Sequence, residues 1–245
     1  MPLLGPGDLA SGEPEAPHTA LEPAAIVRAL RPHLRRARRR RIERVLAQRL
    51  ASVTVVLEHP YDPHNGAAVL RTAEALGVLD VHVVRGAEGF AFSRKVTVNA
   101  HKWLNVYVHA DTRACLRALR AAGYGLWAAL PPTLGTAPVA LDAPATVASP
   151  AALVFGNEHA GLTEEAIACC DAPFHLPMFG FGESFNLSVS VALALQPLCA
   201  ARRAVLGRDG DVVGVRRDRL RAAYYARSAR YALRILCDSI RKTIS

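Results

Sequence analysis

Several features that would assign this 245-residue chain to a common class of protein are absent. No apolar run approaches the about 18 residues that a membrane-spanning helix needs. The first 25 residues contain neither the basic region nor the apolar run of a signal peptide. We therefore expect no membrane span, no secretion and a cytoplasmic protein.

The familiar metal, disulfide and nucleotide motifs are missing as well. The five cysteines include no C-x-x-C pair, so we expect reduced, mostly buried thiols and no metal site. There is no Walker loop, no H-E-x-x-H and no G-x-S-x-G. The Gly-x-Gly at residues 180–182 lacks the third glycine of a dinucleotide fingerprint.

Lysine is nearly absent, because only three of the thirty basic residues are lysines. The net charge of +9 is unevenly placed: residues 28–49 carry a net +9 and residues 202–245 a net +8, whereas residues 1–27 and 50–201 each carry a net −4. Arginine pairs bidentately with phosphate and stacks on bases. Solvated helix faces are the plainer interpretation of one basic run, but two runs favour a polyanionic partner.

The same division predicts four segments. We expect a mobile extension over residues 1–27, a basic helical segment over 28–50 divided at Pro32, an α/β domain over 51–201, and a basic helical extension over 202–245. Within the domain, apolar runs alternate with helical patterns, which indicates a mostly parallel sheet with helices on both faces. The expected strands are residues 53–58, 81–84, 104–108, 126–130, 153–155 and 174–176. The expected helices are residues 65–77, 113–122, 163–169 (with Thr163 as N-cap) and 185–195.

The basic tail carries three tyrosines among its arginines, at positions 224, 225 and 231. Aromatic residues interleaved with arginine suit contact with RNA. They also suit a helix that packs its tyrosines on the core or on a second subunit, and we favour packing slightly.

Three loops stand where an expected strand gives way to a helix. The first is Pro63-His64-Asn65, followed by Arg71-Thr72-Ala73 and Gly77. The second is Phe155-Gly156-Asn157-Glu158, followed by Gly161-Leu162. The third is Leu176-Pro177-Met178, followed by Ser184-Phe185-Asn186. Each pattern is weak alone, since Asn65 could be an N-cap and Arg71 a surface residue. Parallel sheets bind ligands at such strand ends.

Taken in order and with their spacing, the loops resemble the three motifs of the SpoU family of SPOUT RNA 2′-O-ribose methyltransferases. The residues His101-Lys102-Trp103 match a further family stretch. The arginine-rich segment before the first strand resembles the amino-terminal RNA-binding helix of TrmH-type tRNA (guanosine 18) 2′-O-methyltransferases. The resemblance covers roughly residues 36–203.

The resemblance implies a fold, a cofactor and a partner. The carboxyl-terminal part of the domain would form a deep trefoil knot, and two copies would form a homodimer with the active site across the interface. The knot would hold S-adenosyl-L-methionine. Residues of the knot and of the loop before it would contact the cofactor: Ala129, Gly156, Glu158, Leu176, Met178 and Phe185. Phe185 stands where the family usually has leucine and Gly182-Glu183 where Val-Gln is common, so packing around adenine is expected to differ.

The resemblance also implies methyl transfer to a ribose 2′-hydroxyl. In the family, the arginine matching Arg71 is held to a substrate phosphate and is proposed as the activating base. Because a guanidinium scarcely deprotonates, Arg71 could instead stabilise the developing alkoxide. Asn65 would orient Arg71, and Ser184 and Asn186 would hold the ribose and the cofactor end of the pocket. The residues implied to bind RNA are Arg38, Arg41, Arg49 and His64.

The implied substrate is the D-loop guanosine of tRNA. Two alternatives remain open at this point. One keeps the chemistry and moves it to ribosomal RNA or another tRNA position. The other is a catalytically silent RNA-binding protein on the same scaffold.

Overall fold

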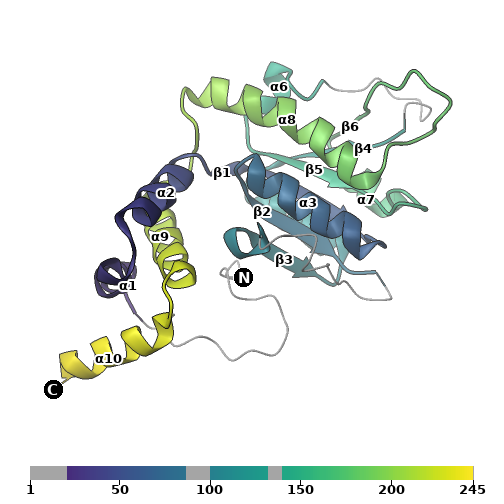
Figure 1. The fold of residues 1–245 in the computed structure, drawn as a ribbon. Helices are drawn as coiled ribbons and strands as arrows, with labels where there is room; N and C mark the ends of the chain where they lie inside the picture. Colours follow the sequence, from purple (N-terminus) through teal and green to yellow (C-terminus); the bar gives the residue numbers. More distant parts are fainter. Residues whose placement is uncertain (1–20, 87–99, 132–139, 245) are drawn as a thin grey trace. The chain divides into compact units, whose positions relative to one another are not determined.

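The computed structural model describes residues 21–86, 100–131 and 140–244, and these residues form two compact units (Figure 1). The sheet unit spans Leu50–Arg208, and the helical unit combines the chain up to Arg49 with the chain from Asp209 onward. The two basic segments, predicted as separate extensions, thus belong to one unit, and the boundaries lie at 49/50 and 208/209.

The sheet unit contains a six-stranded parallel sheet. Its strands are β1 (Leu50–Glu58), β2 (Val78–Val84), β3 (Asn105–His109), β4 (Gly125–Ala129), β5 (Ala151–Phe155) and β6 (Ala172–Phe174). Their order is β3-β2-β1-β5-β4-β6, and every neighbouring pair is parallel. β1 is central and almost wholly buried, as its run of β-branched residues predicted. The predicted parallel α/β class is therefore confirmed; β6 ends two residues earlier than predicted.

Helices connect and cover these strands. They are α3 (Pro63–Ala75), α5 (Thr112–Ala121), α6 (Pro144–Val147), α7 (Glu164–Cys169) and α8 (Leu187–Leu206), with a 3-10 turn, η3, at Ala100–Trp103. In Figure 1, α3 and α8 pack together in front of the sheet. Buried residues of α5 and α7 pack instead with Val56, Val84 and Val154 of the strands. Thr163 caps α7 as predicted, because its hydroxyl accepts from the N–H of Ala166 at 3.1 Å.

The longest helix, α8, differs from the predicted 185–195. It begins after its N-cap Asn186, continues through Pro197, and ends at Gly207, whose φ of +62° is the left-handed conformation that glycine favours. By length and composition α8 could cross a membrane, with a mean hydropathy of 1.4. Arg202 shows its actual setting: this arginine is buried in the sheet unit and donates to the Ser52 hydroxyl at 2.9 Å and to the Val147 carbonyl at 2.6 Å. These bonds hold the carboxyl-terminal half of α8 to the rest of the sheet unit.

The helical unit consists of α1 (Pro23–Leu30), a 3-10 turn η2 (Arg31–His33), α2 (Arg36–Ala47), α9 (Gly214–Ser228) and α10 (Ala232–Ile244). Helix α1 begins inside the segment predicted as a mobile extension; residues 1–20 lie outside the described residues. The break at Pro32 is confirmed. α9 packs on both α1 and α2, and the Arg221 guanidinium holds both carboxylate oxygens of Glu43 at 2.9 and 3.1 Å. Tyr224 and Tyr225 are buried here, which confirms packing for these two tyrosines, while Tyr231 is exposed.

Candidate functional site

The Glu158 carboxylate joins the first and second predicted loops. Its Oε2 accepts the backbone N–H of Tyr61 at 2.9 Å, and its Oε1 accepts the backbone N–H of Asp62 at 3.2 Å. Oε1 also accepts from Nδ2 of Asn65 at 3.0 Å. Burial alone would raise the pKa of Glu158, but the hydrogen bonds from Tyr61, Asn65, its own backbone N–H and Asp62 outweigh it and lower the pKa. Glu158 is therefore an ionised group that positions the loops.

Asn65 and Asn186 extend this connection to the third loop. The Asn186 Nδ2 donates to the Asn65 Oδ1 at 3.0 Å. The Asn186 Oδ1 in turn accepts from the backbone N–H and the hydroxyl of Ser188, at 2.9 and 2.7 Å, so Asn186 caps α8. One continuous line of hydrogen bonds thus runs from Glu158 through Asn65 and Asn186 to Ser188. All three predicted loops meet in it.

The second loop is closed on itself by backbone contacts. Asn157 and Gly161 exchange two backbone hydrogen bonds of 2.9 Å each, and Gly161 adopts a φ of +70°. A Cβ on Gly156 would lie 2.1 Å from the carbonyl carbon of Gly161, which leaves room only for glycine. The Asn157 side chain donates to the His59 carbonyl at 2.7 Å and ties the loop to the end of β1.

Glu58 is a positioning residue that the sequence patterns did not reveal. It ends β1, is buried, and accepts the hydroxyls of Thr112 and Thr163 at 2.7 Å each and the backbone N–H of Thr163 at 2.9 Å. It therefore fixes the start of α7, directly after the second loop. An acidic residue at the end of an otherwise apolar strand was the signal that could have revealed it, because a buried carboxylate requires several donors.

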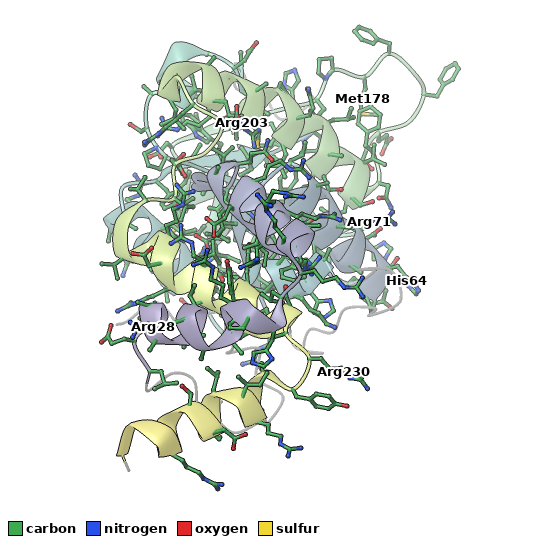
Figure 2. All side chains as sticks on the ribbon, turned by 60° about the vertical axis from the view of Figure 1, so that its left-hand side comes forward. Arg28, His64, Arg71, Met178, Arg203 and Arg230 are labelled. Atoms are coloured by element: carbon green, nitrogen blue, oxygen red, sulfur yellow. The ribbon has the colours of Figure 1, made fainter. Side chains whose placement is uncertain are left out.

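Arg71 and His64 lie on α3, on the same side of the sheet unit as Met178 in Figure 2. Arg71 is exposed and forms no hydrogen bond or ion pair with the part of the chain that the structure describes. Asn65 bonds to Glu158 and Asn186, so the structure does not place it as an orienter of Arg71. His64 is exposed and its Nδ1 lies 3.1 Å from Asp62. The Arg71 guanidinium is thus open to an anionic ligand.

The predicted cofactor residues lie at the carboxyl ends of neighbouring strands. Ala129 ends β4, Gly156 follows β5, and Leu176 and Met178 follow β6. The ends of β4 and β6 are joined, since the N–H of Leu130 donates to the Phe174 carbonyl at 3.0 Å. Leu176 and Met178 are half-buried apolar side chains, which offer a flat ligand ring a surface. These features fit a nucleoside with an apolar face.

Two residues of the third loop, Ser184 and Phe185, are exposed. Phe185 is 38% exposed. Ser184 is also exposed, and its side chain takes no part in the line of hydrogen bonds among the described residues. The structure therefore brings Asn65, Glu158 and Asn186 together and leaves Ser184 beside them.

The three arginines predicted to bind RNA have different environments. Arg41 is exposed on α2, and Arg38 is half-buried, with its Nε donating to the Ser228 hydroxyl at 3.2 Å. Arg49 is only 1% exposed; its Nε donates to the Tyr224 hydroxyl at 3.0 Å, and its guanidinium lies 5.9 Å from the centre of that ring. The structure therefore corrects the prediction for Arg49, which holds the helical unit together instead of facing solvent.

A second group of titratable side chains consists of His82, His109 and Cys115. Nδ1 of His82 and Nε2 of His109 are 3.0 Å apart, with ring centres 5.2 Å apart and planes within 22°. The two nitrogens thus face each other as in a hydrogen-bonded imidazole pair. Burial, with a smaller contribution from His109, lowers the pKa of His82 to about 3, and burial raises the pKa of neighbouring Cys115 to about 12. Burial also lowers the pKa of His109.

The chain resembles known proteins over the segment that contains the three loops. The model of the SpoU rRNA Methylase family matches residues 52–196. The chain is 37% identical over 165 residues to a tRNA (guanosine(18)-2'-O)-methyltransferase of Thermus thermophilus, covering 65% of this chain and 80% of the relative. It is 30% identical over 158 residues to a 23S rRNA (guanosine-2'-O-)-methyltransferase of Haemophilus influenzae, covering 63% of this chain and 62% of the relative.

Solved structures share the fold. The A. aeolicus TrmH/SpoU tRNA modifying enzyme superimposes with a TM-score of 0.62 at 22% identity, covering 85% of this chain and 98% of that one. AviRb of Streptomyces viridochromogenes in complex with the cofactor AdoMet superimposes with a TM-score of 0.51 at 24% identity, covering 66% of this chain and 62% of that one.

Proposed function

Because the chain belongs to the SpoU rRNA methylase family, we propose that it transfers a methyl group from S-adenosyl-L-methionine to the 2′-hydroxyl of guanosine 18 in the D-loop of tRNA. The observation that carries the proposal is the line of hydrogen bonds from Glu158 through Asn65 to Asn186. It assembles the three family motifs at the carboxyl edge of the sheet, beside the exposed Arg71.

Arg71 is the residue that we assign to the reacting ribose. S-adenosyl-L-methionine would supply a sulfonium methyl group for in-line displacement by the 2′-oxygen; S-adenosyl-L-homocysteine would leave, and the proton of the 2′-hydroxyl would pass to solvent water. A guanidinium keeps its proton at neutral pH, so Arg71 binds the adjacent phosphate and stabilises negative charge that develops on that oxygen. Its exposure on α3 supports this role, as does the lack of any partner among the described residues.

The residues around the cofactor have separate tasks in this proposal. Gly156 allows the backbone of the second loop to approach the ligand, and Leu176 and Met178 contact the adenine. Glu158 acts through Asn65 and the backbone of residues 61 and 62, so it is a positioning residue and exchanges no proton. Ser184 and Asn186 hold the ribose and the cofactor end of the pocket.

The helical unit supplies the tRNA contacts. Its helix α2 exposes a row of arginines, of which Arg41 belongs to the predicted set and Arg38 is partly accessible. Positive charge of this density binds phosphates with strong salt dependence. The name of the Thermus thermophilus relative favours tRNA and the D-loop guanosine.

Three further properties belong to the proposal. We propose a cytoplasmic location. We also propose a homodimer, because α8 leaves Val189 and Leu193 exposed although the helix packs its other side on α3. We also propose the deep trefoil knot, because β5 lies between β1 and β4 and the chain then returns to β6 beyond β4. The dimer would complete the active site.

Ribosomal RNA is the second candidate substrate, favoured by the name of the Haemophilus influenzae relative. Radiolabelled methyl transfer to unmodified tRNA transcripts and to 23S rRNA fragments separates the two, and digestion to nucleosides identifies the product. Label recovered as 2′-O-methylguanosine from tRNA supports the proposal. Label only in rRNA would identify ribosomal RNA as the substrate. Cofactor binding without label in either RNA would indicate a catalytically silent RNA-binding protein.

A further inference from the structure

Two phenylalanines stand almost wholly in solvent on the loop between β6 and α8. Phe179 is 98% exposed and Phe181 is 109% exposed, although phenylalanine usually contributes its large apolar surface to a core or an interface. Each is followed by a glycine, and a Cβ on Gly180 would meet nothing within 4 Å. The backbone at Gly180, between the two rings, therefore has open space around it, whereas a Cβ on Gly182 would contact the end of the Met178 side chain at 3.7 Å.

The place of these rings ties them to the reaction site. Phe179 directly follows Met178, on the cofactor side of the loop, and Phe181 precedes Ser184 and Asn186, which we assign to the ribose. The line of hydrogen bonds through Asn186 fixes the far end of the loop. A molecule that covers the rings therefore lies beside the nucleotide whose 2′-hydroxyl reacts.

We propose that Phe179 and Phe181 form a stacking platform for an unstacked base of the RNA substrate, either the target guanine or its immediate neighbour. The inference rests on the proposed function. When the ribose of a nucleotide must reach a pocket in a protein, the base of that nucleotide leaves the base stack. In proteins that bind single-stranded RNA, aromatic side chains replace the lost stacking. Stacking needs a flat π surface, which both rings present.

A second copy of this chain is the competing occupant, and the structure argues against it. A protein interface forms best on rigid elements, and the exposed Val189 and Leu193 of α8 already provide an aliphatic face of that kind. The rings instead lie on either side of Gly180, on a loop without helix or strand. This setting suits a flat, separately positioned base better than a packed apolar interface.

The test compares substitutions that keep apolar bulk with substitutions that keep the ring. Phe179→Leu, Phe181→Leu and the double variant remove the π surface, while Phe179→Tyr and Phe181→Tyr retain it. Val205→Ala, an exposed apolar change at the opposite end of α8, is the matched control. The readouts are the dissociation constant for an unmodified tRNA transcript, the dissociation constant for S-adenosyl-L-methionine, and the mass in solution by sedimentation.

We expect each leucine variant to weaken tRNA binding by about 5-fold or more, the lower end of the contribution of base–aromatic stacking, because leucine keeps apolar contact but not the π surface. Cofactor affinity and mass should be unchanged. The tyrosine variants and Val205→Ala should bind tRNA like the wild type. Unchanged tRNA binding in the double leucine variant would overturn the platform, and so would a fall in mass, which would assign the rings to a dimer interface. The wild type could also methylate no RNA while its tRNA binding still depends on the two rings. That result would support the stacking platform and refute only the proposed function.

Discussion

Substituting Gly156 with alanine tests how the second loop shapes the cofactor site. The new Cβ would lie 2.1 Å from the Gly161 carbonyl carbon and 2.2 Å from both the Gly161 oxygen and the Leu162 nitrogen. All three are backbone atoms, so the loop itself must move and the two 2.9 Å hydrogen bonds between Asn157 and Gly161 must break. Two broken hydrogen bonds at about 1 kcal/mol each and overpacking at about 1–3 kcal/mol give a loss of about 3–5 kcal/mol in the free energy of unfolding.

Two other glycines in the same region are matched controls. Gly161→Ala has space for its Cβ but a φ of +70°, so it should cost about 1–2 kcal/mol through strain alone. Gly180→Ala has space and no positive φ, and should stay within about 0.5 kcal/mol of wild type. Urea unfolding gives the stabilities, and calorimetry gives the affinity for S-adenosyl-L-methionine, which should fall with Gly156→Ala. Equal stability of Gly156→Ala and Gly180→Ala would refute the close packing of this loop.

The remaining predictions concern charge. Arg71→Ala should lower turnover at least about 100-fold, as expected when a donor to a developing oxyanion is removed, with cofactor affinity nearly unchanged; an active variant in a methyl-transfer assay would refute its role. The double variant Arg38→Ala, Arg41→Ala should bind tRNA with a weaker salt dependence. In filter binding, the slope of log affinity against log salt should fall by about 0.7–0.9 for each phosphate that the arginines no longer neutralise. An unchanged slope would mean that these arginines only face solvent. Because the folded pKa of Glu158 is lowered, its contribution to stability is present above the ordinary glutamate pKa of about 4.3 and is lost as the pH falls through the folded value. Glu158→Gln should remove that part of the acid dependence in pH-resolved unfolding. Tyr224→Phe should destabilise the chain by about 1–3 kcal/mol, since it leaves a buried guanidinium without its hydroxyl partner; a neutral result in urea would contradict the buried pair.

The strands were predictable because local sequence decides them. A run rich in β-branched residues, such as residues 53–58, favours a strand buried on both faces, and the structure places it at the centre of the sheet. Thr163 was recognisable as an N-cap because its hydroxyl and the acids after it act within one helical turn. The length of α8 was not predictable, since Pro197 normally ends a helix and tertiary packing holds this one together.

Contacts between distant residues were beyond the sequence patterns. Arg49 looked like one more surface arginine because its partner Tyr224 lies 175 positions away. Glu58 likewise gave no sign of Thr112 and Thr163, which only the parallel strand order brings to it. The three loops were recognisable because each follows an expected strand, and their order and spacing gave the resemblance to a family. Their joining by Glu158, Asn65 and Asn186 depends on hydrogen bonds between residues up to 121 positions apart.

In the proposed reaction, one ribose hydroxyl of tRNA accepts the methyl group. The most direct measurement is radiolabelled methyl transfer from S-adenosyl-L-methionine to two tRNAs that differ by one atom, one with guanosine and one with 2′-deoxyguanosine at position 18. We expect label on the first tRNA and none on the second. Equal label on both would contradict the proposed reaction, because the methyl group would then have gone to another atom or another nucleotide.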